Sequence, residues 1–523
     1  MEAHFDYCII GAGPAGLQLG YYFEQAARSY VIFESGTTPA ESFKRYPRHE
    51  RLISINKLYT GCDDPETNLR WDWNSLLSDN PQRMFKDYSR KYFPNRSDMV
   101  RYLTAFAQDW NLKIRYNHEI VQVAKEEGPE SLFHLTARTG EVHTCRRLIV
   151  ATGLQQPFIP AIPGIELTEN YANADLDPAR FTNQRVLIIG KGNSGFETAE
   201  ALTEYTAIMH VASATPLRFA WKTHFIGHLR AVNNNFLDTY QLKQQNGVLD
   251  VRIEGIRRRE DGLGVTVNWV HAPRERQELV YDHVIVCAGF RFDDSIYGES
   301  CRPALAINDR FPAQRSNWES TNVESLYIAG TLTQMRDYKK VASAFVDGFR
   351  YNARALFHLL NQKFHGIEWP SVGVAPADFV QHIIDRLART SALWAQFGFL
   401  CDVLHVQRDG TSRYFYELPV DYLLDGGIGK LEECYSITLE YGEQHGDPFN
   451  SDRITQSDSD NAHLSFYLHP VVRHYRDLKL VSEHHIVENL ENQWTAGVHV
   501  EPLRKYLAGD SVAVAQSATS SHC

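Results

Sequence analysis

Short apolar runs and helical patterns alternate along the first part of the chain. Residues 6–11 form an apolar run, a helical pattern of apolar positions starts at Pro14 after a Gly-rich turn, and a second apolar run ends at Glu34. This order predicts a strand, a helix and a parallel strand. A further apolar run at 147–153 leads into the Pro-rich residues 155–164, whose composition is typical of a linker. The first domain is therefore predicted to be interrupted there.

The same pattern begins again after the linker. Residues 185–190 form an apolar run that precedes a second Gly-rich turn and a helical pattern, and the next apolar run is 208–213. After two more apolar runs, at 282–289 and 326–330, the apolar and aromatic positions of 341–360 recur at helical spacing. We therefore predict an α/β fold class with two Rossmann-like folds, the first of which is completed by a long helix.

These patterns set the expected domain boundaries. The first domain comprises residues 1–160 and 320–365, and the second comprises residues 161–319. Residues 366–507 are rich in aromatic side chains and histidine and include strand-like runs, which predicts an additional C-terminal α+β domain. The small and polar tail, 508–523, is expected to be disordered.

Composition and charge narrow the class of protein. The 523 residues exceed what one hydrophobic core usually supports, and the net charge of -11 disfavours a nucleic acid or an anionic membrane as partner. No apolar stretch has transmembrane length, and no secretory pattern precedes the first apolar run. We expect a cytoplasmic protein that acts on a small molecule, with a homodimer as an open alternative.

The first Gly-rich turn has the form of a dinucleotide-binding fingerprint. Gly11, Gly13 and Gly16 lie directly after a strand and open a helix, and Glu34 ends the next strand. The glycines allow a tight turn, a close approach to a pyrophosphate and close packing of helix on strand. Because a carboxylate at the position of Glu34 accepts hydrogen bonds from a ribose and repels a 2'-phosphate, this site favours FAD or NAD.

The second Gly-rich turn repeats the fingerprint with one difference. Gly190, Gly192 and Gly195, with Asn193 and Ser194 between them, again follow a strand and open a helix. The next strand ends at Ser213, with no acidic residue there, and Arg218 and Lys222 follow closely. These side chains could bind a 2'-phosphate, so NADPH is favoured over NADH.

Four further residues are predicted to contact cofactors: Arg45, Gly153, Gly289 and Gly330. Gly330 ends a strand just before the long helix, where its backbone would approach the FAD phosphates or the isoalloxazine edge. The alternative is that Gly330 only terminates the strand.

Several segments resemble known families. The two fingerprints and the segment YFPNRSDMVRYLTAFA at 92–107 resemble the class B flavin-dependent monooxygenases, which include flavin-containing and N-hydroxylating enzymes. Over residues 5–507 the chain is similar to the FAD-dependent oxidoreductase domain proteins of the endoplasmic reticulum, the ERFAD type. The segments that carry this similarity include 45–61, 68–78, 223–243 and 337–355. The chain has neither the secretory nor the retention signal of that type, so we do not expect its lumenal role.

The resemblance to the monooxygenases implies a reaction. Flavin reduced by NADPH would react with O2 to form a C4a-hydroperoxide, which transfers one oxygen atom to a soft nucleophile. Asn56 falls where these enzymes carry an asparagine near the flavin and the nicotinamide, and it is predicted to be catalytic as well as cofactor-binding. The alternative is that Asn56 caps a turn.

Basic and amide side chains supply candidate substrate contacts. Arg291 follows an apolar run at a predicted strand end, and we assign it a catalytic role. Arg48 and Lys57 flank Asn56 and could hold a substrate carboxylate, and Asn234 belongs to a polar cluster that could line the substrate channel. Alternatively, the basic residues bind cofactor phosphates or lie on a solvated face.

Cysteines and histidines do not suggest further chemistry. The eight cysteines form no C-x-x-C pair, which speaks against a disulfide reductase. No metal is predicted, because the spacing of the C-terminal histidines matches no standard site. Those histidines are His445, His463, His469, His474, His484 and His485.

The function favoured by these observations is an FAD- and NADPH-dependent monooxygenase that N-hydroxylates a small amine or amino acid, with O2 as co-substrate, in bacterial specialised metabolism. The alternative is an NADPH-dependent flavin reductase or oxidase in a thiol redox relay, as the ERFAD resemblance implies. A third hypothesis is a flavoprotein without catalytic activity, but two complete fingerprints speak against it.

Overall fold

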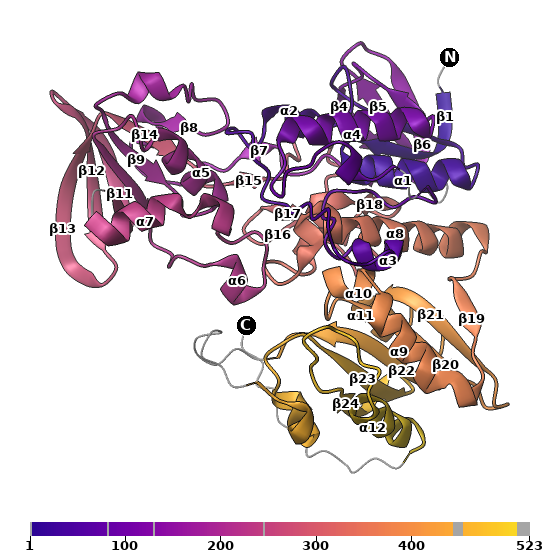
Figure 1. Cartoon of the computed structure of the whole chain (residues 1–523). Coiled ribbons are helices and arrows are strands. Elements are labelled where there is room, and N and C mark those ends of the chain that lie inside the picture. Colours follow the sequence, from indigo (N-terminus) through magenta and orange to yellow (C-terminus); the bar gives the residue numbers. More distant parts are fainter. Residues whose placement is uncertain (1–2, 81–82, 129–130, 244–245, 443–452, 510–523) are drawn as a thin grey trace. The chain divides into compact units, whose positions relative to one another are not determined.

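The structure is a computed structural model that describes residues 3–80, 83–128, 131–243, 246–442 and 453–509 (Figure 1). Most of the tail predicted to be disordered, and His445, lie outside these ranges. The chain divides into two compact units. The N-terminal unit comprises Met1–Tyr59, Asp72–Gln314 and Glu319–Phe349, and the C-terminal unit comprises Thr60–Trp71, Arg315–Trp318 and Arg350–Cys523.

The N-terminal unit contains two seven-stranded sheets. The first has the order β3-β2-β1-β6-β5-β4, with β18 paired to β6. Its strands are β1 (Ala3–Ile10), β2 (Tyr30–Phe33), β3 (Ile114–Arg115), β4 (Ile120–Lys125), β5 (Phe133–Ala137), β6 (Val142–Val150) and β18 (Leu326–Ile328). Strands β1, β2, β3, β6 and β18 are parallel, whereas β4, β5 and β6 form an antiparallel meander. The apolar runs of the sequence therefore occupy central strands, which are buried on both faces in a parallel sheet.

Helix α1 (Pro14–Gln25) follows β1 directly and is buried along most of its length. Even the amide of Gln18 is fully buried, because it donates to the carbonyl of Leu77 (2.9 Å) and accepts from the N–H of Leu77 (2.7 Å). The two other helices of this region are α2 (Glu41–Arg45) and α4 (Arg96–Asp109).

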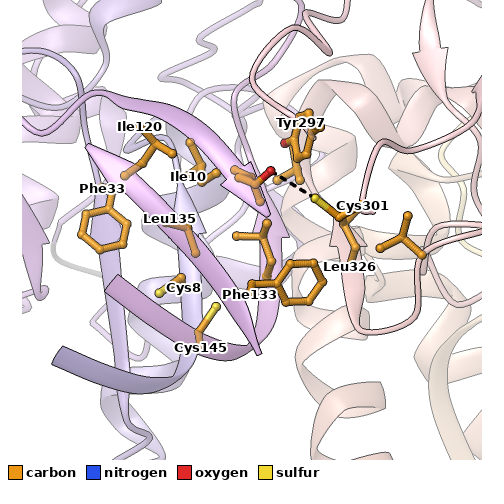
Figure 2. Packing of buried hydrophobic residues seen from close by; sticks show 14 of the residues in the cluster. Cys8, Ile10, Phe33, Ile120, Phe133, Leu135, Cys145, Tyr297, Cys301 and Leu326 are labelled. Atoms are coloured by element: carbon orange, nitrogen blue, oxygen red, sulfur yellow. Dashed lines mark hydrogen bonds between the residues drawn. The ribbon is translucent and has the colours of Figure 1, made fainter. Parts of the chain in front are cut away.

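Figure 2 shows the apolar core between the strands of the first sheet. Cys8 and Cys145 come from the neighbouring strands β1 and β6 and lie next to each other in it. The core also includes Tyr297 and Cys301, and the thiol of Cys301 donates to the carbonyl of Val123 at 3.3 Å. The sequence assigned these two residues to the second domain, 161–319. In the structure their side chains belong to the core of the first sheet.

The second sheet has the order β13-β12-β11-β10-β9-β14-β8. Its strands are β8 (Glu169–Asn170), β9 (Arg185–Ile189), β10 (Ile208–Ser213), β11 (Gly247–Arg259), β12 (Gly262–Trp269), β13 (Ala272–Tyr281) and β14 (His283–Val286). Helix α5 (Asn193–Leu202) follows β9, as the fingerprint predicts, and α6 (Ala220–Thr223) and α7 (Asn235–Lys243) come after β10. The short strands β7 (Gln156–Pro157) and β15 (Phe290–Arg291) pair antiparallel where the chain enters and leaves this fold.

The C-terminal unit has an antiparallel sheet of six strands in the order β19-β21-β20-β22-β23-β24. These are β19 (Ser371–Gly373), β20 (Leu400–Val406), β21 (Ser412–Pro419), β22 (Glu433–Glu440), β23 (His469–Arg476) and β24 (Lys479–His485). Its helices are α3 (Pro65–Asn68), α9 (Phe379–Arg389), α10 (Ala392–Ala395), α11 (Val420–Leu424) and α12 (Gly497–Leu507), together with most of α8 (Val346–His365). Helix α9 is amphipathic, and its buried residues Val380, Ile383, Ile384 and Leu387 follow helical spacing. The additional α+β fold predicted from the sequence is confirmed.

Among the described residues, no helix combines the length and the apolar composition needed to cross a membrane.

Candidate functional site

The first Gly-rich turn forms an open cradle at the N-terminus of α1. Gly11 has a φ of +106°, a conformation that a residue with a side chain rarely adopts, and its Cα lies against the carbonyl of Ala151. Gly13 is the N-cap of α1 and no side chain caps the helix. A Cβ built on Gly13 would meet no atom within 4 Å, so space lies over the free N–H groups of the first turn. Such a helix end fits a pyrophosphate.

Glu34 lies beside this cradle. Its carboxylate accepts hydrogen bonds from the N–H of Ala12 (2.8 Å) and of Gly36 (2.8 Å), and the residue is 5% exposed. The side chain predicted to bind a ribose is therefore held at the Gly-rich turn by backbone N–H groups.

Gly330 also reaches this cradle. It begins the 3-10 helix η5 (Gly330–Met335) after β18, and a Cβ on it would lie 2.8 Å from the Cβ of Ala15 in α1. The absence of a side chain therefore lets the end of β18 approach the start of α1, and the predicted cofactor contact of Gly330 stays a prediction. Gly153 lies in open surroundings at the end of the apolar run that contains β6, and Arg45 is exposed in the last turn of α2.

The second Gly-rich turn reproduces the first. Gly190 has a φ of +127° and lies against the carbonyl of Cys287, and Gly192 is an uncapped N-cap of α5 with nothing within 4 Å of its Cβ position. Gly289, after β14, is likewise open on its Cβ side. The N–H groups at the start of α5 are thus free to receive a second nucleotide, and the residues present fit two dinucleotides.

An ion pair that sequence reasoning missed lies at the predicted phosphate end of this second cradle. Lys191, between the first two glycines, pairs with Asp250 of β11, and β11 places Asp250 opposite Ser213. β10 itself ends at Ser213 without an acidic residue, as predicted, but the neighbouring strand β11 supplies a carboxylate beside that end. His271 also contacts Asp250 at 3.0 Å. Burial raises the pKa of Asp250, but Lys191 and His271 outweigh it and hold the pKa below its usual value.

The other residues predicted for the nicotinamide cofactor differ in exposure and in hydrogen bonding. Arg218 and Lys222 are exposed and Ser194 is half-buried. Ser213 is bound within its own turn, where its hydroxyl lies 2.9 Å from that of Thr215.

Asn193 organises the loop that follows β10. Its amide donates to the carbonyl of His228 (2.8 Å) and accepts from the N–H of Arg230 (3.0 Å) and from Asn233 (3.1 Å). The first helical residue of the fingerprint therefore holds a long-range loop in place, a function that no local motif indicates.

Two buried polar atoms of this loop, on Arg230 and Asn234, have no hydrogen-bond partner in the described chain. The guanidinium of Arg230 lies 4.9 Å above the ring of Trp73, and its Nη1 is buried and has no hydrogen-bond partner in the described chain. The Oδ1 of Asn234, four residues on, is also buried without a described partner. Burial lowers the pKa of Arg230. Unpaired buried polar groups are costly, so each of these two atoms calls for a further partner, such as a water molecule or a ligand.

The structure favours a structural interpretation of Asn56. Its side chain is 2% exposed, and its amide N–H groups donate to the carbonyls of Ser89 (2.8 Å) and Lys91 (3.3 Å). Both amide hydrogens thus hold the segment at 89–91, which lies 33 to 35 residues away along the chain, and do not cap a local turn. A catalytic role for Asn56 finds no support in this geometry.

Arg48 is committed in the same way. Its guanidinium donates to the carbonyls of Tyr171 (2.9 Å), Ala172 (2.9 Å) and Ala174 (2.7 Å). The hydroxyl of Tyr171 accepts from the N–H of Arg48 and donates to Glu197 in α5, whose pKa burial raises to about 7. Arg48 therefore links the two nucleotide folds of the N-terminal unit, which favours a structural role over substrate binding.

The two remaining predicted residues differ in their surroundings. Arg291 donates from Nε to the amide oxygen of Gln156 at 2.6 Å across the β15–β7 pair, whereas Lys57 is exposed. Neither lies in a group of converging catalytic side chains in the described chain.

A buried histidine pair was not predicted. The Nε2 atoms of His118 and His143 are 2.7 Å apart, and Glu141 lies 3.6 Å from the latter. At that separation one imidazole donates a hydrogen bond to the other, whereas Nδ1 of His143 is buried and has no hydrogen-bond partner in the described chain.

Comparison with known proteins places the chain. Residues 8–330 match the model of a family described as pyridine nucleotide-disulphide oxidoreductase. The chain is 38% identical to FAD-dependent oxidoreductase domain-containing protein 2 of Mus musculus, over 96% of this chain and 84% of the mouse protein.

Solved structures agree in fold. A flavin-containing monooxygenase from Stenotrophomonas maltophilia superposes with a TM-score of 0.54 at 20% identity, over 69% of this chain and 99% of that one. An ornithine N-hydroxylase from Kutzneria superposes with a TM-score of 0.51 at 16% identity, with the same coverage. At these identities the likeness shows the fold alone.

These comparisons confirm the predicted α/β class with two dinucleotide-binding folds, and FAD and a pyridine nucleotide as the cofactors. The chain belongs to the pyridine nucleotide-disulphide oxidoreductase family, among flavin-dependent oxidoreductases similar to the mouse protein.

Proposed function

We propose that the protein is an NADPH-dependent flavin monooxygenase that oxygenates the amine of a small amino acid. The observation that carries the proposal is that the chain has two nucleotide cradles but almost no accessible thiol among its described cysteines. Of the cysteines that the structure describes, only Cys62 is not buried. A protein that reduces disulfides needs accessible thiols, so O2 is the better acceptor for electrons that leave the flavin.

The overall reaction consumes one NADPH, one O2 and one proton for each substrate, and it yields the oxygenated substrate, NADP+ and water. FAD, when bound, supplies the two-electron chemistry that activates O2. The chain's own residues bind and orient the reactants. Gly13 and Gly192 leave room for the two pyrophosphates, and Glu34 accepts hydrogen bonds beside the first of them.

Arg230 and Asn234 support an amino acid as the substrate. A carboxylate could accept from Nη1 of Arg230, and an amine could donate to Oδ1 of Asn234, since both atoms are buried without a hydrogen-bond partner in the described chain. The amine reacts only when unprotonated, and a guanidinium near it lowers its pKa through repulsion of positive charge. The N-hydroxylation of an amine is thus the reaction that this pair supports.

Lys191 and Asp250 support NADPH over NADH. The side chain of Lys191 is 3% exposed, and its ammonium group neutralises the carboxylate that β11 brings beside Ser213. Without that neutralisation, Asp250 would repel a 2'-phosphate.

The described family keeps a thiol-dependent reductase as a second candidate. Burial speaks against it, since it raises the pKa of Cys8, of Cys401 and, to about 12, of Cys434, and a buried thiol is a poor nucleophile.

The Lys191→Met variant should discriminate between the two nicotinamide cofactors. We expect its KM for NADPH to rise about tenfold, a change of about 1.4 kcal/mol, because Asp250 then faces the 2'-phosphate without its cation. The KM for NADH should change far less, since a carboxylate accepts a hydrogen bond from a 2'-hydroxyl. Steady-state kinetics with both cofactors measure this. The matched control is Lys113→Met, at an exposed lysine paired with Glu24. Equal effects on both cofactors would contradict the assignment.

The accessibility of the thiols tests the second candidate. In a Cys523→Ser variant, we expect one fast-reacting thiol, that of Cys62, when the native protein is titrated with a thiol-specific chromogenic reagent. The remaining thiols should react only after unfolding in guanidinium. If reduction by NADPH exposed additional fast-reacting thiols, a thiol relay would be the better account.

The fate of isotopically labelled O2 tests the proposed function itself. The flavin-loaded protein is supplied with NADPH and a panel of amino acids and small amines, and NADPH, H2O2 and products are quantified. We expect at least one amino acid to lower H2O2 release and to gain one labelled oxygen atom per NADPH consumed, as detected by mass spectrometry. Complete conversion of O2 to H2O2 with every amine would overturn the proposal and favour an oxidase.

A further inference from the structure

A cavity of about 500 Å³ lies within the C-terminal unit, apart from the residues of either nucleotide cradle. Helices α3, α8 and α9 and strand β21 contribute its walls. Its volume is in the range of sites for small molecules. Six charged side chains line it: Glu66, Arg354, Asp385, Arg386, Arg389 and Glu417.

A β-bulge between β20 and β21 positions Glu417, one of the lining residues. The register of β20 and β21 shifts between Cys401 and Val403, and Glu417 adopts a φ of 58°, in the left-handed region. The fully buried carboxylate of Asp402 fixes the bulge by accepting from the N–H of Glu417 at 2.9 Å. A non-glycine residue in this conformation costs about 1 kcal/mol or more, and such residues and bulges concentrate at functional sites.

The cavity is lined by charges of both signs. Three arginines and three carboxylates are among its lining residues. Two further carboxylates pair with lining arginines, Asp402 with Arg386 and Asp64 with Arg389. Glu417 joins Arg386, whose Nη2 lies 2.6 Å away, to Arg354. Burial lowers the pKa of His358, which also lines the cavity, to about 4, so its imidazole is neutral at physiological pH. A ligand with one group of each sign can pair with charges of both signs here.

Some polar atoms of the lining remain uncommitted. Arg386 donates from Nε to Asp402 and from Nη2 to Glu417, but its Nη1 lies 3.8 Å from Glu66, beyond hydrogen-bonding distance. Oε1 of Glu66 accepts from the N–H and the hydroxyl of Ser391, and within the described chain Oε2 has no hydrogen bond. His358 makes only ring contacts there. The lining thus offers a positively charged hydrogen-bond donor (Arg386), a negatively charged acceptor (Glu66) and a neutral acceptor (His358).

We propose that this cavity binds a free α-amino acid as its zwitterion. The carboxylate accepts from Nη1 of Arg386, and the ammonium group donates to Oε2 of Glu66 and to the imidazole of His358. This site lies in the C-terminal unit, and its binding does not depend on the proposed oxygenation, so either proposal can fail alone.

Binding to the full-length, flavin-loaded protein tests the proposal. The common L-amino acids are screened by thermal shift, and the best ligand is titrated by calorimetry beside its decarboxylated amine and its N-acetylated acid. We expect the zwitterion to bind at least about tenfold more tightly than either analogue, since each analogue lacks one of the two charges. Failure of every amino acid to bind, or equal binding of an analogue, would overturn the proposal.

Variants locate the site. Glu66→Gln keeps the oxygen that accepts from Ser391 but removes the negative charge, and it should weaken binding about tenfold or more. The control Glu368→Gln changes an exposed glutamate of the same unit, paired with Arg413, and should leave binding unchanged. His358→Phe keeps an aromatic ring at this position but removes the ring nitrogens, and it should also weaken binding. This variant is the alternative test if Glu66→Gln does not fold. Undiminished binding in the folded Glu66 or His358 variant would place the amino acid elsewhere, including the flavin site, and would contradict the proposal.

Discussion

Both nucleotide sites depend on one close contact inside each Gly-rich turn. In each turn the third glycine, in the first turn of the helix, packs against the carbonyl oxygen of the first glycine. A Cβ on Gly16 would lie 2.0 Å from the carbonyl oxygen of Gly11, and a Cβ on Gly195 would lie 2.2 Å from that of Gly190. Only glycine allows each helix to start so close to the preceding strand. The helix N-termini then point their free N–H groups into open space, and the neighbouring strands bring Glu34 and Asp250 to the rims of the two cradles. The use of FAD and NADPH depends on this repeated contact.

Local sequence was sufficient to predict the features that depend on local geometry. The glycines at 11–16 and 190–195, the strands before them and the helices after them all lie within short segments, so spacing alone identified them. The buried apolar strands and the amphipathic α9 were also accessible, because side-chain periodicity reflects which face is covered.

Residues that act through long-range contacts could not be predicted in this way. Asp250 faces Ser213 only because β11 pairs with β10, and the partners of Arg48 lie more than 120 residues away along the chain. Asn56 matched a family position, but its amide is used by the segment at 89–91. The cavity of the C-terminal unit combines α3 with elements beyond residue 350, which no linear pattern connects. In each case the missing information was which distant segment packs against the residue.

The distinct use of the two cradles can be tested by filling each one separately. Valine at Gly13 or Gly192 meets no protein atom within 4 Å at its Cβ, so its side chain would occupy cofactor space without disturbing the fold. The decisive measurement is the absorbance of bound flavin in the purified variants and its bleaching by NADPH without oxygen. The account predicts that Gly13→Val loses FAD, while Gly192→Val retains FAD that dithionite reduces normally and NADPH reduces far more slowly. Retention of FAD by a folded Gly13→Val variant, or reduction of Gly192→Val by NADPH at the wild-type rate, would contradict it.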